Sequence, residues 1–185
     1  MSLQPTGGSS VERGDAPGLG ESLTALLRRD LRALAREIES YPDDAAPWSL
    51  LPGLPNSAGG LVRHVCGNLQ HFIGAELGQS GYQRDRAAEF GAPPVSRAAL
   101  LALLSETESM VHRILPALTA ARLAEPYPQP VAGTRLVTGD FLIHLAGHCA
   151  FHLGQVDYHR RAVTGEGGSI GPTAIPELAS ARPVA

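Results

Sequence analysis

Three histidines recur at every fourth residue near the C-terminal end of the sequence, at His144, His148 and His152. On a helix, each step of four residues rises about 6 Å and turns about 40°, so neighbouring imidazoles lie on one face and two of them can bind one metal ion. The outer two lie about 12 Å apart along the axis. Because two metal–nitrogen bonds of about 2.1 Å cannot span that distance, one outer histidine must have another role.

A third ligand must come from another part of the chain. His64 and His71 share a face of an earlier predicted helix with Asn68. Their spacing of about 10.5 Å lets only one of the two join the site. Either histidine can combine with either adjacent pair of the later run. The distances along the helices do not choose among these triads. Three neutral imidazoles leave a divalent ion with one or more open positions, as in reactive sites, and they accept zinc or nickel.

Other polar residues near these motifs have expected roles of their own. Gln155 follows His152 by three residues on roughly the same helix face, so we expect it, like Asn68 on the partner helix, to hydrogen-bond and orient a bound water or ligand. Cys66 and Cys149 point away from the predicted ligand faces. We expect both cysteines to be small core residues.

Two charged motifs and one aromatic residue allow more than one interpretation. Arg84-Asp85-Arg86 has the chemistry to hold an anionic substrate, although charge pairing at the surface is the more common role. His159-Arg160-Arg161 is interpreted as a solvated helix end, where cations interact favourably with the helix dipole. Trp48 lies in a proline-rich loop, where it either lines the mouth of a pocket or, as we expect, anchors that loop on the helices.

Helical periodicity of apolar residues predicts the elements that must position these side chains. Four long amphipathic helices joined by irregular loops indicate an all-α four-helix bundle, with helices at about 21–41, 57–77, 96–123 and 140–163. The predicted N-caps are Asn56 or Ser57 for the second helix, Ser96 for the third and Asp140 for the fourth. Pro116 is expected to kink the third helix near its end. The crossover at 78–94 should hold one helical turn.

Composition separates the ends of the chain from its centre. We expect a flexible N-terminal arm at 1–19, the helical domain at 20–164 and a loose C-terminal tail at 165–185. The arm is rich in glycine and polar residues and offers too little apolar surface to offset the entropy of ordering.

The overall balance of residues narrows the class of protein. The chain has 185 residues, of which 43% are hydrophobic and 18% charged, which is typical of one soluble globular domain. A net charge of -3 argues against nucleic acid as a partner. No apolar run approaches the roughly 20 residues that cross a membrane, so we expect no membrane partner. Two cysteines cannot form a disulfide framework, and we expect a cytoplasmic protein.

Two motifs together resemble those of the DinB-like (DinB/YfiT) superfamily: residues 61–68, with His64, and residues 148–155, with His148 and His152. The order of the elements, the Pro55-Asn56-Ser57 turn and the segment 84–90 also match, and the resemblance spans about residues 19–163. It implies a metal-binding four-helix bundle of the up-down-down-up type, often a homodimer. The family pattern takes its ligands from the second and last helices, which selects His64, His148 and His152.

The remaining histidines, His71 and His144, are then bystanders or neighbours of the site.

Two classes of function follow from this resemblance. The first class is a metal-dependent enzyme of one of two types. It is either a thiol S-transferase-like protein, which uses a low-molecular-weight thiol on a small-molecule substrate, or a hydrolase. Glu76 and Asp157 lie on the motif helices, but nothing in the sequence places either as a general base at the ion. Thiol transfer is therefore favoured, because a thiolate is already a nucleophile. The second class is a non-catalytic, dimeric metal-binding module for stress response or ligand binding.

Overall fold

The computed structural model describes residues 16–184, so residues 1–15 of the predicted arm lie outside the described part. Within that part the protein is helical, and the pairing of extended segments is limited to two isolated bridges. Four long helices dominate: α1 (Leu19–Glu39), α2 (Ala58–Leu69), α4 (Arg97–Ile114) and α6 (Thr138–Thr164). The prediction of an all-α protein is confirmed.

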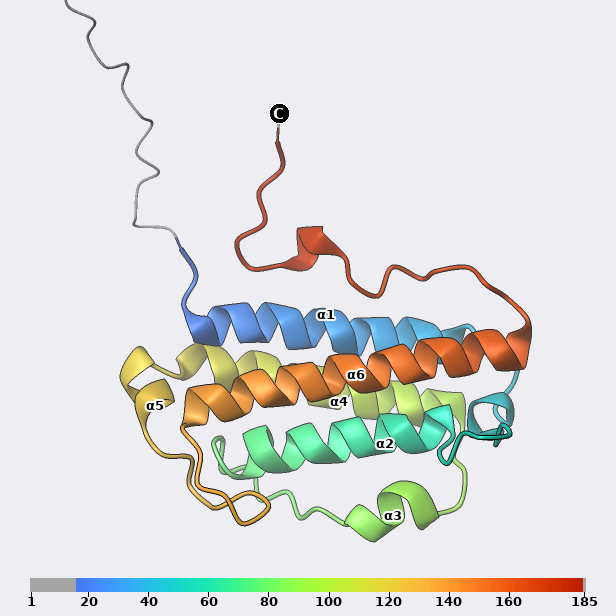
Figure 1. Ribbon diagram of the computed structural model, residues 1–185, viewed down its shortest axis with the longest axis horizontal. Helices are drawn as coiled ribbons and strands as arrows, with labels where there is room; N and C mark the ends of the chain where they lie inside the picture. Colours follow the sequence, from blue (N-terminus) through green and yellow to red (C-terminus); the bar gives the residue numbers. More distant parts are fainter. Residues whose placement is uncertain (1–15, 185) are drawn as a thin grey trace, which may run out of the picture.

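The four long helices lie side by side (Figure 1). α1 packs against α4 and α6, and α2 packs against the same two helices, which places α1 and α2 on opposite sides of the α4 and α6 pair. The apolar stripes that predicted these helices all face the space between them, where burial removes their surface from water. Fully buried members of this core are Leu27, Leu34, Val62, Leu69, Leu100 and Leu142.

α2 begins where the sequence predicts. The Oγ atom of Ser57 accepts a hydrogen bond from the backbone N–H of Gly60, at 3.2 Å. The helix then continues as a π-helical turn over Gln70–Ala75, which the sequence did not reveal. The Trp48 ring packs directly on the first turn of α2. A Cβ atom at Gly59 would lie only 2.7 Å from that ring, so the glycine leaves the space that the ring occupies. The Trp48 Nε1 atom donates to the Val95 carbonyl, at 2.9 Å, so the anchoring role is confirmed.

The third predicted helix ends earlier than expected. Pro116 was expected to kink a helix that runs to about residue 123, but α4 ends at Ile114. The chain continues as the 3₁₀ turn Leu115–Ala117 and the separate short helix α5 (Ala120–Ala124). Proline has no N–H to donate and its ring crowds the preceding turn. Here the effect is strong enough to end the helix.

The start of α6 also corrects a prediction. Val137 is the N-cap residue, and Asp140, expected as the cap, lies exposed in the first turn. The preceding loop is fixed by the backbone bond from Thr138 N to the Glu125 carbonyl, at 2.9 Å, and this contact decides where the helix begins. Asp140 still carries a charge that suits the positive end of the helix dipole.

The motif at the other end of α6 is not a solvated helix end. His159 is only 1% exposed and Arg160 only 2% exposed, so that interpretation is wrong for both residues. The Nε atom of Arg160 lies 2.6 Å from Oε2 of Glu37, and its Nη2 atom lies 3.2 Å from Oδ1 of Asp157. A buried guanidinium needs such partners, and they come from α1 and from its own helix.

The C-terminal tail lies along α1 in Figure 1 instead of leaving the molecule freely. Arginines of the long helices hold its backbone. Arg160 donates to the carbonyls of Glu166 and Gly168, at 3.0 and 2.8 Å, and Arg36 donates to the carbonyl of Gly171, at 3.1 Å. The tail therefore helps to cover the buried end of α6.

None of the helices in residues 16–184 is both long enough and apolar enough to cross a membrane.

Candidate metal centre

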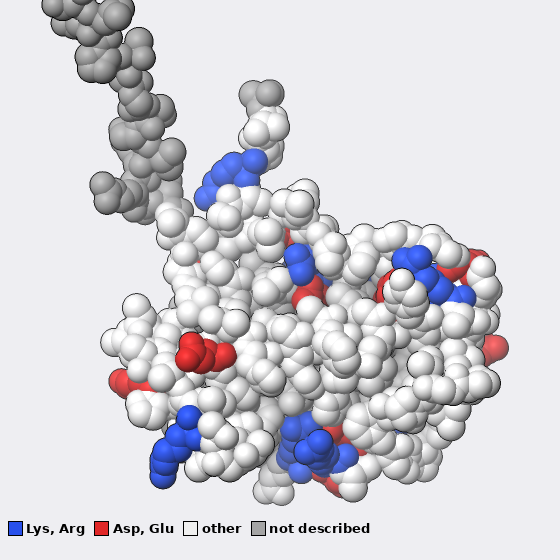
Figure 2. Space-filling view, viewed as in Figure 1, with Lys and Arg blue, Asp and Glu red and all other residues white. Residues whose placement is uncertain are grey.

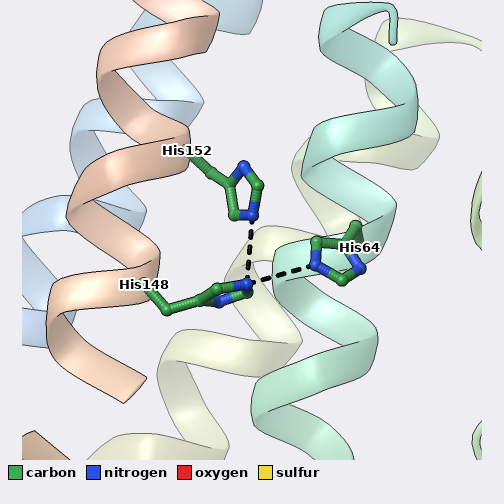
Figure 3. A group of neighbouring side chains, drawn as sticks. All are labelled: His64, His148 and His152. Atoms are coloured by element: carbon green, nitrogen blue, oxygen red, sulfur yellow. Dashed lines mark hydrogen bonds between the residues drawn. The ribbon is translucent and has the colours of Figure 1, made fainter. Parts of the chain in front are cut away.

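Three histidines from two helices meet at one point (Figure 3). His64 comes from α2, and His148 and His152 come from successive turns of α6. The Nε2 atom of His148 lies 3.2 Å from Nε2 of His64 and 3.0 Å from Nε2 of His152. One ligand atom from each residue lies within 4.8 Å of the other two. Helix spacing left several triads open, and this is the one whose nitrogens the fold brings together.

A carboxylate determines which nitrogen of His64 faces the cluster. Nδ1 of His64 lies 2.8 Å from Oε2 of Glu89, which is 5% exposed. Because a carboxylate oxygen only accepts hydrogen bonds, Nδ1 carries the proton and Nε2 keeps its lone pair toward the other two imidazoles. Glu89 lies on α3 (Arg86–Gly91), a short helix that packs against α2.

Glu89 is itself fixed from two sides. Arg84 donates to both carboxylate oxygens, with Nε at 2.6 Å from Oε1 and Nη2 at 3.0 Å from Oε2. On the α2 side, a Cβ atom at Gly67 would lie only 2.4 Å from Oε1 of Glu89. The glycine therefore leaves the space that the carboxylate occupies. Such outer hydrogen bonds normally hold metal-binding histidines in the productive orientation.

Gln155 lies beside His152, as its spacing predicts, and it contacts that imidazole directly. Its Oε1 atom accepts a hydrogen bond from Nδ1 of His152, at 2.6 Å. The Nε2 atom of His152 is therefore also free of a proton and points toward His148. Gln155 is exposed, whereas Glu89 is buried, so the two supports differ in charge and in surroundings.

A bound divalent cation would satisfy the three imidazole nitrogens better than hydrogen bonds among the imidazoles can. A single proton on Nε2 of His148 can serve only one of its two nitrogen neighbours, so at least one pair of lone pairs faces each other at 3.0–3.2 Å. Nitrogen ligands on a tetrahedral zinc ion, with bonds of about 2.1 Å, lie about 3.4 Å apart. A small shift of the imidazoles would therefore accommodate an ion that satisfies all three nitrogens.

The family model of the DinB superfamily matches residues 23–156, a stretch that includes all three histidines and their partners Glu89 and Gln155. The chain belongs to the DinB superfamily. The resemblance inferred from the two histidine motifs is thereby confirmed. Comparisons with curated proteins and with solved structures gave no match.

In this DinB-superfamily chain, burial keeps the imidazoles in the form that binds metal. Burial first, and then the neighbouring imidazoles of His152 and His64, lower the pKa of His148 to about 4. The pKa of His152 is also lowered, first by burial, with its bond to Gln155 acting in the opposite direction. Both are therefore neutral at neutral pH, and a metal ion does not have to displace a proton from them.

The two other histidines of these helices stay outside the cluster. His144 stacks on His148 with ring centroids 6.3 Å apart, one turn before the cluster. His71 lies in the π-helical turn, where its Nε2 atom is 3.4 Å from Nε2 of Gln129. Neither belongs to the group of histidines within ligand distance, as the family pattern implies.

The cysteines and Asn68 complete the comparison with the sequence. Cys66 and Cys149 are fully buried, as expected, and burial raises the pKa of the Cys66 thiol to about 12. A thiol of that kind is not a metal ligand at neutral pH. Asn68 is buried as well, and its Oδ1 atom has no hydrogen-bond partner, so its expected role of orienting a bound water or ligand stays a prediction.

Glu89 is the site residue that sequence reasoning missed. It lies 25 residues after His64, and nothing in local periodicity connects the two. One local signal for it is an acidic residue on a single predicted helical turn close to Arg84-Asp85-Arg86. For Arg84, the charge-pairing interpretation is the correct one, although the pair is largely buried.

One pocket reaches the cluster, and a second lies beside it behind Gln155. One has a volume of about 290 Å³, and His64 and His148 form part of its wall. The other has a volume of about 390 Å³ and is mainly apolar, with Leu61, Phe151 and Tyr158 in its wall. Gln155 lines this second pocket and connects it to His152.

Proposed function

We propose that this chain is a divalent-metal-dependent enzyme of the thiol S-transferase-like type, with His64, His148 and His152 as the ligands of a zinc or nickel ion. One observation carries the proposal: three imidazole nitrogens converge, and two of them are held with their lone pairs inward by Glu89 and Gln155. The packing of α1 and α2 against both α4 and α6 supports a four-helix bundle of the up-down-down-up type as the scaffold.

A divalent ion at this point supplies an open coordination position that holds a thiol as its thiolate or lowers the pKa of a water molecule. The chain's own residues supply the rest. Glu89 and Gln155 orient two imidazoles, and the adjoining pockets offer space for the substrate. The apolar walls of the larger pocket would exclude water from an electrophilic substrate placed there.

Thiol transfer is better supported than hydrolysis. The carboxylate found in contact with the cluster, Glu89, is engaged by His64 and Arg84. Asp157, the other acidic candidate on α6, is paired with Arg160 and Arg161. Among residues 16–184, no free carboxylate contacts the three histidines as a general base for water. A thiolate needs no such base, so a low-molecular-weight thiol is the proposed partner.

The proposal includes a homodimer in the cytoplasm, with no nucleic acid or membrane as partner. The outer face of α6 exposes large apolar side chains at Ile143 (52%), Phe151 (63%) and Tyr158 (75%). These residues follow each other at spacings of eight and seven residues, so they lie on one side of the helix. A second copy of the chain would bury this stripe, and light scattering of the purified protein tests the mass.

Elemental analysis of the purified protein tests the metal site. We expect about one divalent ion per chain in the wild type, by analogy with other three-ligand sites, and none in His148→Ala. His144→Ala is the matched control, because His144 lies one turn away on the same helix and outside the cluster. It should keep its metal.

Turnover then tests the enzyme. The metal-loaded wild type should consume a thiol together with an electrophile, and His148→Ala should not. Equal metal content in the wild type and His148→Ala would remove the site. A fully loaded protein without turnover on a broad panel of thiols and electrophiles would instead favour the non-catalytic, dimeric binding module.

A further inference from the structure

The smaller pocket beside the cluster has walls of a particular chemistry. Its volume is about 290 Å³, the size of a small ligand, and it is open to His64 and His148 on one side. Arg84, Arg86 and Asn68 provide most of its remaining polar wall. The larger pocket, by contrast, touches none of the three clustered histidines.

The charge in this pocket has one sign. Two arginines line it, and no aspartate or glutamate of the described residues does. Arg84 is neutralised by Glu89 at its back. Arg86 is exposed, and within residues 16–184 it has neither an ion pair nor a side-chain hydrogen bond. Figure 2 shows arginine side chains gathered over the segment that leads into α3. Arg86 therefore leaves a positive charge without a partner at the pocket.

Asn68 gives a second and independent indication of a ligand. It is only 7% exposed, it lines the pocket one turn after His64, and its Oδ1 atom has no hydrogen-bond partner. Nearly all buried polar side-chain atoms in proteins are hydrogen-bonded. An amide oxygen is an acceptor, so a ligand that satisfies it must bring an N–H or O–H donor, while the Nδ2 atom of the same amide is the donor that suits a carboxylate.

We propose that this pocket binds the carboxylate end of the small molecule that reaches the metal centre, with Arg86 as the counter-charge and the Nδ2 atom of Asn68 as a hydrogen-bond donor. The guanidinium group suits a carboxylate because its planar fork of N–H donors matches the two oxygens. The inference rests on the proposed function and adds to it the substrate class: a thiol or electrophile that carries a carboxylate a short distance from its reacting atom.

Calorimetric titration of the zinc-loaded full chain tests this inference without an activity assay. The probes are 3-mercaptopropionate and its uncharged analogue 3-mercaptopropionamide. The acid should bind about tenfold more tightly than the amide in the wild type, since hydrogen bonds between charged groups are roughly twice as strong as neutral ones. Arg86→Gln should remove this preference and leave the affinity for the amide unchanged.

Two further variants sharpen the result. Arg113→Gln makes the same change at another exposed arginine, which lies on α4 away from the pocket, and should keep the tenfold preference. Asn68→Leu keeps the volume of the side chain but removes its amide. It should weaken the binding of both probes about fivefold.

Each outcome decides a separate question. Equal binding of acid and amide to fully loaded wild type would overturn the inference and leave the proposed function standing. A preference that survives in Arg86→Gln would also overturn it, because the carboxylate would then be bound by the metal ion and not by the pocket. Unchanged binding in Asn68→Leu would remove Asn68 from the assignment. A purified wild type without metal would overturn the proposed function, and this inference with it.

Discussion

Two side-chain clusters along α6 differ in how far the protein itself satisfies their polar atoms. The closed cluster is centred on His159 and Arg160, and the open cluster consists of His64, His148 and His152. At the closed cluster, Nδ1 of His159 accepts from the Tyr41 hydroxyl, at 2.6 Å, and its Nε2 atom donates to the Ser49 carbonyl, at 2.8 Å. The neighbouring Arg160 is paired with Glu37 and with backbone carbonyls. At the open cluster, the Nε2 atoms of His64, His148 and His152 face only one another.

The difference shows which buried histidines suit a ligand. His159 is nearly inaccessible and uses both nitrogens, so nothing remains to bind an ion. In the open cluster, Glu89 and Gln155 take the outer nitrogens and leave the inner ones unsatisfied. His159 is also more deeply buried than His148 and His152, which are half-buried. The number of unused lone pairs separates a structural cluster from a candidate metal site.

The largest expected effect lies in the closed cluster. Arg160→Met should lower the free energy of unfolding by about 3–5 kcal/mol, because it leaves the buried carboxylate of Glu37 without its partner. Urea unfolding measures the loss. Metal content, measured on the same samples, should stay at the wild-type level.

The double variant Glu37→Met/Arg160→Met is the control for this prediction, since it removes both charges together. It should recover much of the lost stability. Loss of metal in the folded Arg160→Met protein would contradict the separation of the two clusters, and a loss of less than about 1 kcal/mol would contradict the structural role of Arg160.

A smaller effect is expected in the open cluster. Glu89→Gln should weaken metal affinity about 10–100-fold, because a neutral amide replaces the carboxylate that fixes the proton on His64. Titration against a competing chelator measures the affinity. Glu106→Gln, at an exposed position on α4, is the matched control and should bind metal like the wild type.

Gly67→Ala extends the same test without changing a charged group. The added methyl would displace Glu89, so metal affinity should fall in the same direction. Gln155→Leu should have a weaker effect than Glu89→Gln, because Gln155 is neutral and exposed. Equal affinities in all these variants would show that the outer hydrogen bonds do not orient the cluster.

The smallest effect concerns pH in the metal-free protein. The pKa of His148 is lowered to about 4 in the folded state, while an unfolded histidine titrates near 6.5. As pH falls from 6.5 to 4, the unfolded chain takes up its proton first, so stability is lost in that window and is fully present above it. Urea unfolding of chelator-treated protein at pH 7 and pH 5 measures this loss.

His148→Gln is the matched variant for the pH experiment. It should show a smaller loss of stability between pH 7 and pH 5 than the wild type. Some loss should remain, because the pKa of His152 is lowered as well. An identical pH dependence in the two proteins would mean that His148 is not buried among its neighbours as described.

The local sequence pattern predicted most of the helices. It failed for residues whose burial and partners depend on contacts that are distant in the sequence. The Ser57 and Ser96 caps were predicted correctly because a cap is made within four residues. Arg160 was wrongly interpreted as solvated because arginine is usually exposed, and its partner Glu37 lies 123 residues away in the sequence. The role of Glu89 was missed for the same reason.

The sequence by itself determined that His148 and His152 share a helix face, because four residues make about one turn. It also determined, through the two motifs together, the family to which the chain belongs. Helix spacing left His64 and His71 open and the family pattern pointed to His64; the tertiary structure shows that His64 meets the pair, and it alone decided which nitrogens point inward. The physical reason is that the rotation and position of α2 relative to α6 depend on the packing of the whole core, to which every helix contributes.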